Sequence, residues 1–125
     1  HVKRISTGSA FKATMGYSRA IVKGGWCFVS GVTGYNYQTM TMPETASEQA
    51  QNCFATIASV LTEAGFEMSD IVRVQYTLTG ENLVAEVTPV LGAVMGAIRP
   101  AATMVIAGLI RPEMKIEIEV TAFKG

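Results

Sequence analysis

Two glutamates near the end of the chain are the side chains best placed, by type and spacing, to do chemistry. Glu117 and Glu119 lie in an alternating segment, 115–123, that predicts a strand. A strand rises about 3.3 Å per residue, so both carboxylates would share one face about 7 Å apart. Such a carboxylate can hold or activate a water for a hydrolytic step. The pattern alone favours a plainer interpretation, a solvated face with Lys115 as counter-ion.

Further candidates for ligand binding lie where predicted elements end. Arg99 closes a helical pattern just before Pro100. Its guanidinium could anchor an anion or interact with the carbonyl end of the helix, and the pattern does not separate these interpretations. The turn Ser30-Gly31-x-x-Gly34 follows a predicted strand and could bring backbone N–H groups to a ligand. Glycine turns are common, so this signal is weak.

Single aromatic and sulfur-containing side chains give weaker signals still. Tyr17 and Tyr35 stand in predicted loops, where they could line a pocket but more often cap the edge of a core. Met104 and Met114 are expected to be packing residues. The sequence contains no phosphate-binding loop, dinucleotide-binding fingerprint or metal-binding motif, so no cofactor is expected.

Composition excludes several classes of protein. The 125 residues include ten Lys and Arg against ten Asp and Glu, and only 16% are charged. Nucleic-acid and anionic membrane surfaces attract positively charged proteins, so neither partner is expected. A single histidine, His1, and the lack of a Cys-x-x-Cys motif exclude a zinc site and a His-based nucleophile pair. Cys27 and Cys53 are expected to be unpaired thiols, and the expected location is the cytoplasm.

Hydrophobic periodicity predicts six strands and two helices in a single domain, 1–125. The clearest element is a helix that begins at the capping box Thr45-x-x-Glu48 and ends at Gly65. Gly24-Gly25 predicts a hairpin turn between two β-rich segments. Pro89 lies within the second helical pattern, where it either kinks the helix or marks its first turn. The predicted strands are 2–6, 19–23, 26–30, 71–78, 103–109 and 115–123, the second helix is 83–98, and the segments 7–17 and 31–43 are expected to be loops.

This order of elements predicts an α+β fold, a two-layer sandwich in which both helices cover one face of a mixed sheet. The other face would carry Ile21, Trp26 and Phe28 together with Glu117 and Glu119. An uncovered face that is half apolar usually packs against a partner. The low charged fraction also suggests that part of the surface is covered by other copies of the chain.

The last third of the chain resembles the signature of the YjgF/Rid family, the reactive intermediate deaminases, also called the L-PSP family. The resemblance is carried by 99–112, which begins Arg-Pro-Ala-Ala-Thr, and by Lys-Ile-Glu-Ile-Glu-Val at 115–120. The segments Phe28-Val29-Ser30-Gly31 and Gly65 to Asp70-Ile71 match as well, so the resemblance covers about residues 15–123. It implies a chorismate-mutase-like fold and a homotrimer, with helices outside and clefts for small-molecule ligands between the subunits.

The resemblance also implies roles for particular residues. In family members that hydrolyse imines and enamines, an Arg grips the substrate carboxylate, a Glu in the last strand positions the water and a Tyr lines the cleft. Counted onto this chain, the Glu is Glu117 and the Tyr is Tyr17, whereas the Arg position holds Ala102. Arg99 lies three residues earlier and could serve instead. Glu117 is therefore the catalytic candidate, and the substrate-binding candidates are Tyr17, Arg99, Ala102, Met104, Ser30 and Gly31.

Three functions follow as expectations. The first is hydrolysis of a small imine or enamine, with Glu117 as general base and backbone N–H groups polarising the substrate. Because Ala102 cannot clamp a carboxylate, 2-imino acids are not expected to be favoured. The second is non-catalytic binding of a small ligand in the same cleft, to which the loss of the Arg also points. The third, cleavage of RNA, is disfavoured by the zero net charge and by the lack of a suitable histidine.

Overall fold

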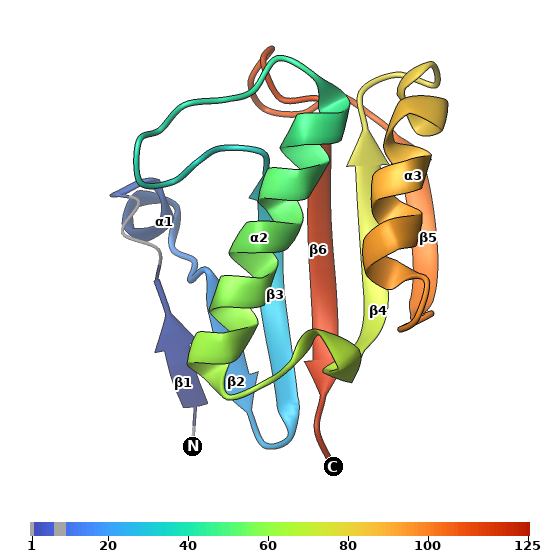
Figure 1. Ribbon diagram of the computed structural model, residues 1–125. Coiled ribbons are helices and arrows are strands. Elements are labelled where there is room, and N and C mark those ends of the chain that lie inside the picture. The colour runs from blue at the N-terminus through green and yellow to red at the C-terminus, as the bar shows by residue number, and fades with distance from the viewer. Residues whose placement is uncertain (1, 7–9) are drawn as a thin grey trace.

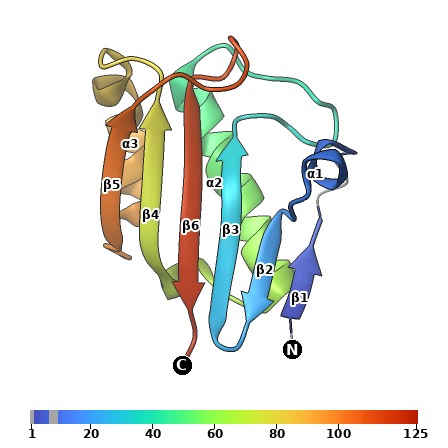
Figure 2. The same ribbon diagram turned by 180° about the vertical axis from the view of Figure 1, so that it is seen from behind.

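The computed structural model describes residues 2–6 and 10–125. In chain order its elements are β1 (Val2–Ile5), α1 (Ala10–Met15), β2 (Ala20–Lys23), β3 (Trp26–Thr33), α2 (Ala46–Ala64), the 3₁₀ turn η1 (Met68–Asp70), β4 (Ile71–Leu78), α3 (Leu83–Met95), β5 (Ala101–Ile106) and β6 (Ile116–Phe123). The strands form one sheet in the order β1-β2-β3-β6-β4-β5, and both long helices lie on the same face of it (Figures 1 and 2). Neighbouring strands are antiparallel except β4 and β5, which are parallel. The predicted two-layer α+β sandwich with a mixed sheet is confirmed.

Helix α2 forms where its capping signals predict it. The Thr45 hydroxyl accepts a hydrogen bond from the backbone N–H of Glu48 at 3.1 Å, which satisfies one of the free donors of the first turn. Gly65 ends the helix in the left-handed conformation, with φ of 85°. A residue with a side chain is strained there, whereas glycine is not.

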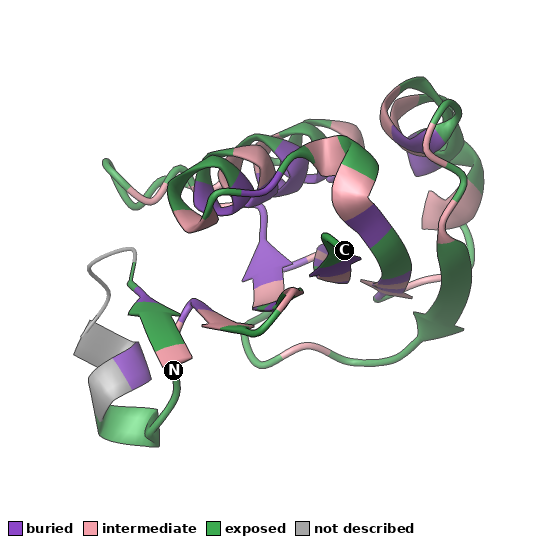
Figure 3. Ribbon diagram, turned by 90° about the horizontal axis from the view of Figure 1, so that it is seen from below, coloured by how far each residue is buried: buried purple, intermediate pink, exposed green. Residues whose placement is uncertain are grey.

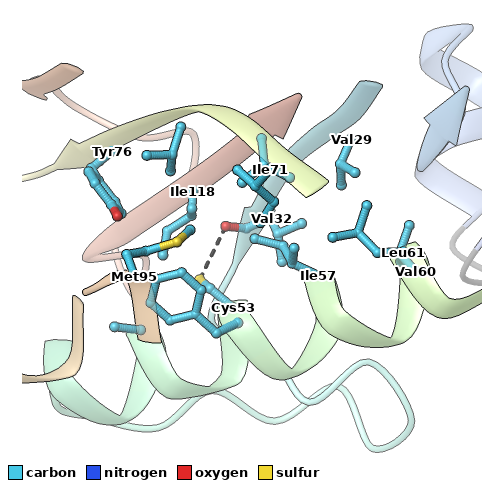
Figure 4. Packing of buried hydrophobic residues seen from close by; sticks show 14 of the residues in the cluster. Val29, Val32, Cys53, Ile57, Val60, Leu61, Ile71, Tyr76, Met95 and Ile118 are labelled. Atoms are coloured by element: carbon cyan, nitrogen blue, oxygen red, sulfur yellow. Dashed lines mark hydrogen bonds between the residues drawn. The ribbon is translucent and has the colours of Figure 1, made fainter. Parts of the chain in front are cut away.

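The core fills the space between the helices and the sheet. Figure 3 shows the buried residues gathered between these two layers. In β6 the residues Ile116, Ile118, Val120 and Ala122 are all buried, as the alternating pattern predicts for one face of a strand. They meet the apolar face of α2, from which Cys53, Ile57 and Leu61 project in Figure 4. The Cys53 thiol also donates to the backbone carbonyl of Val32 at 3.2 Å, which joins α2 to β3.

Two predicted loops contain regular structure. Within 7–17, residues 7–9 lie outside the described part of the chain, and 10–15 form the short helix α1 instead of a loop. Gly16, with φ of 77°, ends this helix, and the Tyr17 N–H donates a hydrogen bond to the Lys12 carbonyl at 2.9 Å. Helix α1 is so short that it has too few turns to show a period in the sequence. The predicted loop 31–43 is also wrong at its start, because β3 continues to Thr33 through pairing with Glu117 of β6.

The edge strand β5 and the helix before it also differ from the prediction. β5 covers 101–106 rather than 103–109, because its parallel pairing with β4 begins at Ala101 and ends where β4 ends, at Leu78. Apolar character therefore does not mark the end of this strand. Helix α3 begins six residues before Pro89, so the interpretation of Pro89 as a first-turn residue is wrong.

The sheet face opposite the helices is uncovered in a single chain (Figure 2). Three aromatic side chains lie at one end of it, and Trp26, Phe28 and Phe123 are each 40% exposed or more. The Trp26 ring lies 4.6 Å from the Phe123 ring and 6.1 Å from the Phe28 ring, between centroids. All six residues of β5, at the sheet edge, are exposed. The predicted half-apolar uncovered face is thus present.

Both cysteines are expected to remain free thiols that react slowly in the native protein. Cys27 and Cys53 are buried and unpaired, and burial raises the pKa of each thiol. Because the thiolate is the reactive form, burial and the raised pKa both slow the reaction of these thiols with reagents. A thiol-specific reagent should titrate two groups per chain after unfolding without reductant, and far fewer within the same time under native conditions. Two fast-reacting groups in the native protein would contradict the buried positions.

Candidate functional site

A hollow of about 380 Å³ opens where β3 ends and β6 begins. Its walls come from α1, the end of β3, the segment 35–40, the loop 110–114 and the start of β6. These segments are distant in the sequence, but the pairing of Thr33 with Glu117 places the two strand ends side by side (Figure 2). The hollow therefore lies on the rim of the uncovered sheet face.

Glu117 lines this hollow, and its carboxyl takes a position that requires a glycine at residue 31 of the neighbouring strand. It is half-buried, and its neighbours Ile116 and Ile118 point into the core, so its carboxyl lies on the uncovered face. A Cβ atom on Gly31 would lie 2.6 Å from the Glu117 Cδ and 2.8 Å from Oε2. The carboxyl thus rests directly on the Gly31 backbone, which any other residue would prevent.

A β-bulge shapes the strand beneath this carboxyl. Between Val29 and Val32 the pairing of β3 with β6 shifts, so that Ser30 and Gly31 together oppose one residue. Arg19 holds the bulge, because its Nη1 donates to the Ser30 and Gly31 carbonyls, both at 2.9 Å. The Ser30 hydroxyl donates to the Ser18 carbonyl at 2.6 Å. The bulge and its hydrogen bonds to Ser18 and Arg19 therefore shape the part of the hollow beside Glu117.

The surroundings of Glu117 disfavour its charge. Burial raises the pKa of this carboxyl, the nearby Glu119 carboxylate raises it further, and the Arg19 guanidinium acts in the opposite direction. A carboxyl with a raised pKa is a better proton acceptor once ionised, which is what a general base requires.

This raised pKa predicts a pH-dependent stability difference between the wild type and Glu117→Gln. Above the ordinary value of 4.5, unfolded chains release the Glu117 proton while native chains still hold it, so native stability falls as pH rises and levels off above the native pKa. The variant has no such proton. Urea unfolding should therefore show the variant gaining stability relative to the wild type from acid to neutral pH. A constant difference across this range would contradict the raised pKa.

Two buried cations line the same hollow. Lys12 is 3% exposed and Arg19 is 2% exposed. The Lys12 Nζ lies 5.9 Å and the Arg19 Cζ 5.7 Å from the centroid of the Tyr37 ring, within the range of cation–π attraction. Burial, followed by the Arg19 charge, lowers the pKa of Lys12. Sequence reasoning missed both residues, and the available signal was the charged Arg19 at the start of a strand-like segment.

The opposite wall of the hollow is held by a polar network. The Tyr35 hydroxyl donates to the Glu113 carboxylate, and burial together with this bond raises the pKa of Tyr35 to about 12. Behind this pair, the fully buried Gln49 donates to the carbonyls of Pro43 and Glu113 at 2.8 and 3.0 Å. Its side-chain carbonyl accepts from the Lys115 N–H at 2.9 Å. Helix α2 thereby fixes the loop that leads into β6.

The structure brings together only some of the residues singled out from the sequence. Tyr17, Gly31 and Glu117 line the hollow, as do Tyr35 and Met114, and Ser30 lies in the bulge beside it. Met114 is also buried, as expected of a packing residue.

The remaining candidates lie elsewhere within one chain. Ala102 pairs with Val74 and Met104 with Tyr76, and these partners point into the core. Directly paired residues project to the same side of a sheet, so positions 102 and 104 face the helix side of the edge strand, away from Glu117. Arg99 is exposed, in the left-handed conformation with φ of 52°. It lies four residues beyond α3, which ends at Met95, so the predicted helix 83–98 is too long at its end.

The described residues contain no group of three or more His, Cys, Asp or Glu side chains arranged to hold a metal ion. Among the same residues, no helix has both the length and the apolar character needed to cross a membrane.

Comparison with known proteins places the chain in a family. The family model described as Endoribonuclease L-PSP matches residues 7–124. The chain belongs to this L-PSP family. The curated relatives include a RutC family protein of Pyrococcus abyssi, 30% identical over 121 residues, which are 96% of this chain and 95% of the relative. The 2-iminobutanoate/2-iminopropanoate deaminase of Dermatophagoides farinae is 28% identical over 92% of this chain and 91% of its own.

Solved structures of similar proteins share the fold. A member of the YjgF family from Mycobacterium tuberculosis superposes with a TM-score of 0.90 at 30% identity, over 99% of this chain and all of that one. The yeast protein Mmf1 superposes with a TM-score of 0.86 at 22% identity, over the full length of both. The resemblance stated from the signature residues is thus confirmed for both family and fold.

Proposed function

We propose that this L-PSP family protein hydrolyses a small imine or enamine, with Glu117 as the general base. The observation that carries the proposal is the Glu117 carboxyl, half-buried with a raised pKa and resting on Gly31 at the wall of a hollow. The deaminase from Dermatophagoides farinae, similar over nearly the whole chain, supports the reaction class.

The proposed reaction uses one water and releases one ammonia. Glu117 accepts a proton from a water as the water oxygen adds to the imine carbon, and it passes this proton to the nitrogen as the C=N bond becomes a C–N bond. The Glu117 carboxylate, ionised again, then accepts the hydroxyl proton of the carbinolamine and delivers it to the nitrogen as the C–N bond breaks, so that the nitrogen leaves as ammonia and the carbonyl forms. An enamine follows the same path after protonation at carbon gives the imine.

The test is the hydrolysis of imines made in place. An amino-acid oxidase acting on an amino acid supplies a 2-imino acid, and semicarbazide captures whatever imine remains. We expect the protein to suppress semicarbazone formation and to speed the appearance of ammonia and the 2-oxo acid. A set of imines with and without a carboxylate would define the substrate. If no imine or enamine were hydrolysed faster than without protein, the hollow would instead serve as a non-catalytic binding site.

We further propose that the working form is a homotrimer whose clefts join two chains. The exposed aromatic cluster Trp26, Phe28 and Phe123 supports an interface on this side of the sheet, and all residues of the edge strand β5 are exposed as well. Ala102 and Met104 also face away from their own Glu117, so they would meet a hollow only in a neighbouring chain.

Light scattering at micromolar concentration is expected to give about three times the chain mass of 13.3 kDa. The physical reason is that burying this apolar face removes large aromatic side chains from water. A stable monomer at that concentration would contradict a cleft built from two chains.

A further inference from the structure

Arg19 is held in place by the strands on both sides of it. Its backbone N–H donates to the Ile5 carbonyl of β1 at 2.8 Å, and its own carbonyl accepts the N–H of Ser30 in β3 at 2.9 Å. The side chain is 2% exposed and lies against the ring of Tyr37. The guanidinium therefore has a fixed position beside the bulge of β3.

The Nη1 atom of this guanidinium holds the backbone on which the Glu117 carboxyl rests. It donates to the carbonyls of Ser30 and Gly31, both at 2.9 Å, and these two residues form the bulge opposite β6. The Glu117 carboxyl packs so closely on Gly31 that a Cβ atom there would lie 2.6 Å from Cδ. A shift of the bulge would therefore displace the surface that supports this carboxyl.

The positive charge of Arg19 also acts on Glu117. It lowers the pKa of this carboxyl, against the larger effects of burial and of the Glu119 charge, which raise it. The charges of Glu117 and Arg19 both reach the Cys53 thiol of α2, whose pKa Glu117 raises and Arg19 lowers. An opposite charge favours the ionised form of a carboxyl, which is the form that accepts a proton from water.

We propose that Arg19 is the positioning residue for Glu117, because it fixes the bulge against which the carboxyl rests and its charge favours the carboxylate form. The role in catalysis rests on the proposed function, whereas the coupling between the two side chains does not depend on it. An arginine that only supported the bulge would leave the ionisation of Glu117 unchanged. The titration of Glu117 therefore distinguishes a positioning role from a merely structural one.

The other charged and titratable groups around Glu117 come from several elements. Glu119 lies on the same strand, and Cys53 projects from α2. The lining of the hollow adds three tyrosines and three charged residues, Tyr17, Tyr35, Tyr37, Lys12, Arg111 and Glu113. Arg19 combines two contacts, because it bonds to the bulge and acts by its charge on Glu117.

The first test needs no substitution of Arg19. Its Nε is buried and has no hydrogen-bond partner in the described part of the chain, so the NMR signal of this N–H is sensitive to nearby charge. In the wild type we expect this signal to change with pH at the same midpoint as the Glu117 carboxyl carbon. Glu117→Gln should abolish the change, and Glu119→Gln should move both midpoints to lower pH, because the Glu119 charge raises the pKa of Glu117. An Nε–H signal that stays constant while Glu117 titrates would overturn the inference.

Two substitutions separate the charge of Arg19 from its hydrogen bonds. Arg19→Gln removes the charge, whereas Arg19→Lys keeps the charge on a shorter side chain that lacks the planar fork. We expect Arg19→Gln to move the midpoint of Glu117 to higher pH by about one pH unit, as for the loss of a neighbouring opposite charge. Arg19→Lys should keep the wild-type midpoint. Arg4→Gln is the matched control, since it removes an exposed arginine of β1, and it should leave the midpoint unchanged.

The same variants are then assayed for imine hydrolysis over a range of pH. The pH at which kcat/KM is half-maximal should rise for Arg19→Gln and stay constant for Arg19→Lys. The rate of Arg19→Lys above this pH should fall by about tenfold or more, because the bulge no longer places the carboxyl accurately. A midpoint that Arg19→Gln leaves unchanged, in a folded variant, would overturn the inference. If neither Arg19 variant folds, the titration of the wild type still decides.

The inference and the proposed function fail in different ways. Coupled titration of Arg19 and Glu117 without hydrolysis of any imine would support the coupling and refute the enzyme. Hydrolysis with a pH profile that is the same in the wild type and in Arg19→Gln would support the enzyme and refute the role of Arg19.

Discussion

Glu117→Gln is expected to lower imine hydrolysis by about 10²- to 10⁴-fold, the usual contribution of a general base. The amide has nearly the same shape and can still rest on Gly31, but it cannot accept the proton from water. Glu119→Gln is the matched control, because it makes the same change on the same face of the same strand at an exposed position. The measurement is kcat and kcat/KM for both variants against the wild type over a range of pH.

The pH profiles provide a second readout of the same assignment. Wild-type activity should rise with pH through the raised pKa of Glu117. Glu119→Gln removes a charge that raises this pKa, so its profile should move to lower pH while the rate at neutral pH stays nearly the same. If Glu117→Gln kept the wild-type rate, or if both variants lost activity equally, Glu117 would not be the base.

Gly34→Ala is expected to destabilise the protein by about 3 kcal/mol or more, the upper range for overpacking a core. A Cβ on Gly34 would lie 2.6 Å from the Gln49 Cα. That atom belongs to the backbone of α2, so relief requires the whole helix to move away from β3. The Asn52 side chain, which donates to the Gly34 carbonyl at 3.0 Å, would lose its position as well.

The matched control for Gly34→Ala is Gly92→Ala. Gly92 lies within α3, is exposed, and has no atom within 4 Å of the added Cβ. Alanine is the better helix former, so this substitution should stabilise by about 0.5–1 kcal/mol. Urea unfolding measures both free energies, and the opposite signs are the diagnostic result. A Gly34→Ala protein as stable as the wild type would contradict the close approach of α2 to β3.

The consequences of Gly34→Ala should extend to the hollow. Gln49 connects α2 to the loop that carries Glu113, and this loop forms one wall of the hollow. A shift of α2 would therefore loosen the Tyr35–Glu113 pair. We expect the folded fraction of this variant to hydrolyse imines with a lower kcat/KM than the wild type.

The sequence was sufficient for the elements whose signals are local. The capping box at Thr45 and the glycine at Gly65 mark the ends of α2, because caps act on neighbouring backbone groups. Alternation correctly predicts β4 at 71–78 and the buried residues of β6. Glu117 was found by its place in this alternation together with the resemblance to the family.

The remaining features depend on contacts between segments distant in sequence. β5 ends at Ile106 because β4 ends beside it, and the bulge at Ser30-Gly31 arises from pairing with β6 and from the Arg19 side chain. No local sequence pattern identifies the strand with which β5 or β3 pairs.

The sequence by itself determined the fold class, the helix α2, the uncovered face and Glu117 as the candidate base. Only the tertiary structure showed that Lys12 and Arg19 share a hollow with Glu117. Lys12 comes from a helix too short to show a period, and Arg19 lies immediately before β2. The pairing of β2 with β3 and of β3 with β6 brings Arg19 to the end of β6 that carries Glu117. The order of the strands in the sheet decides which residues meet in this cluster. Hydrophobic periodicity within a single segment carries no information about that order.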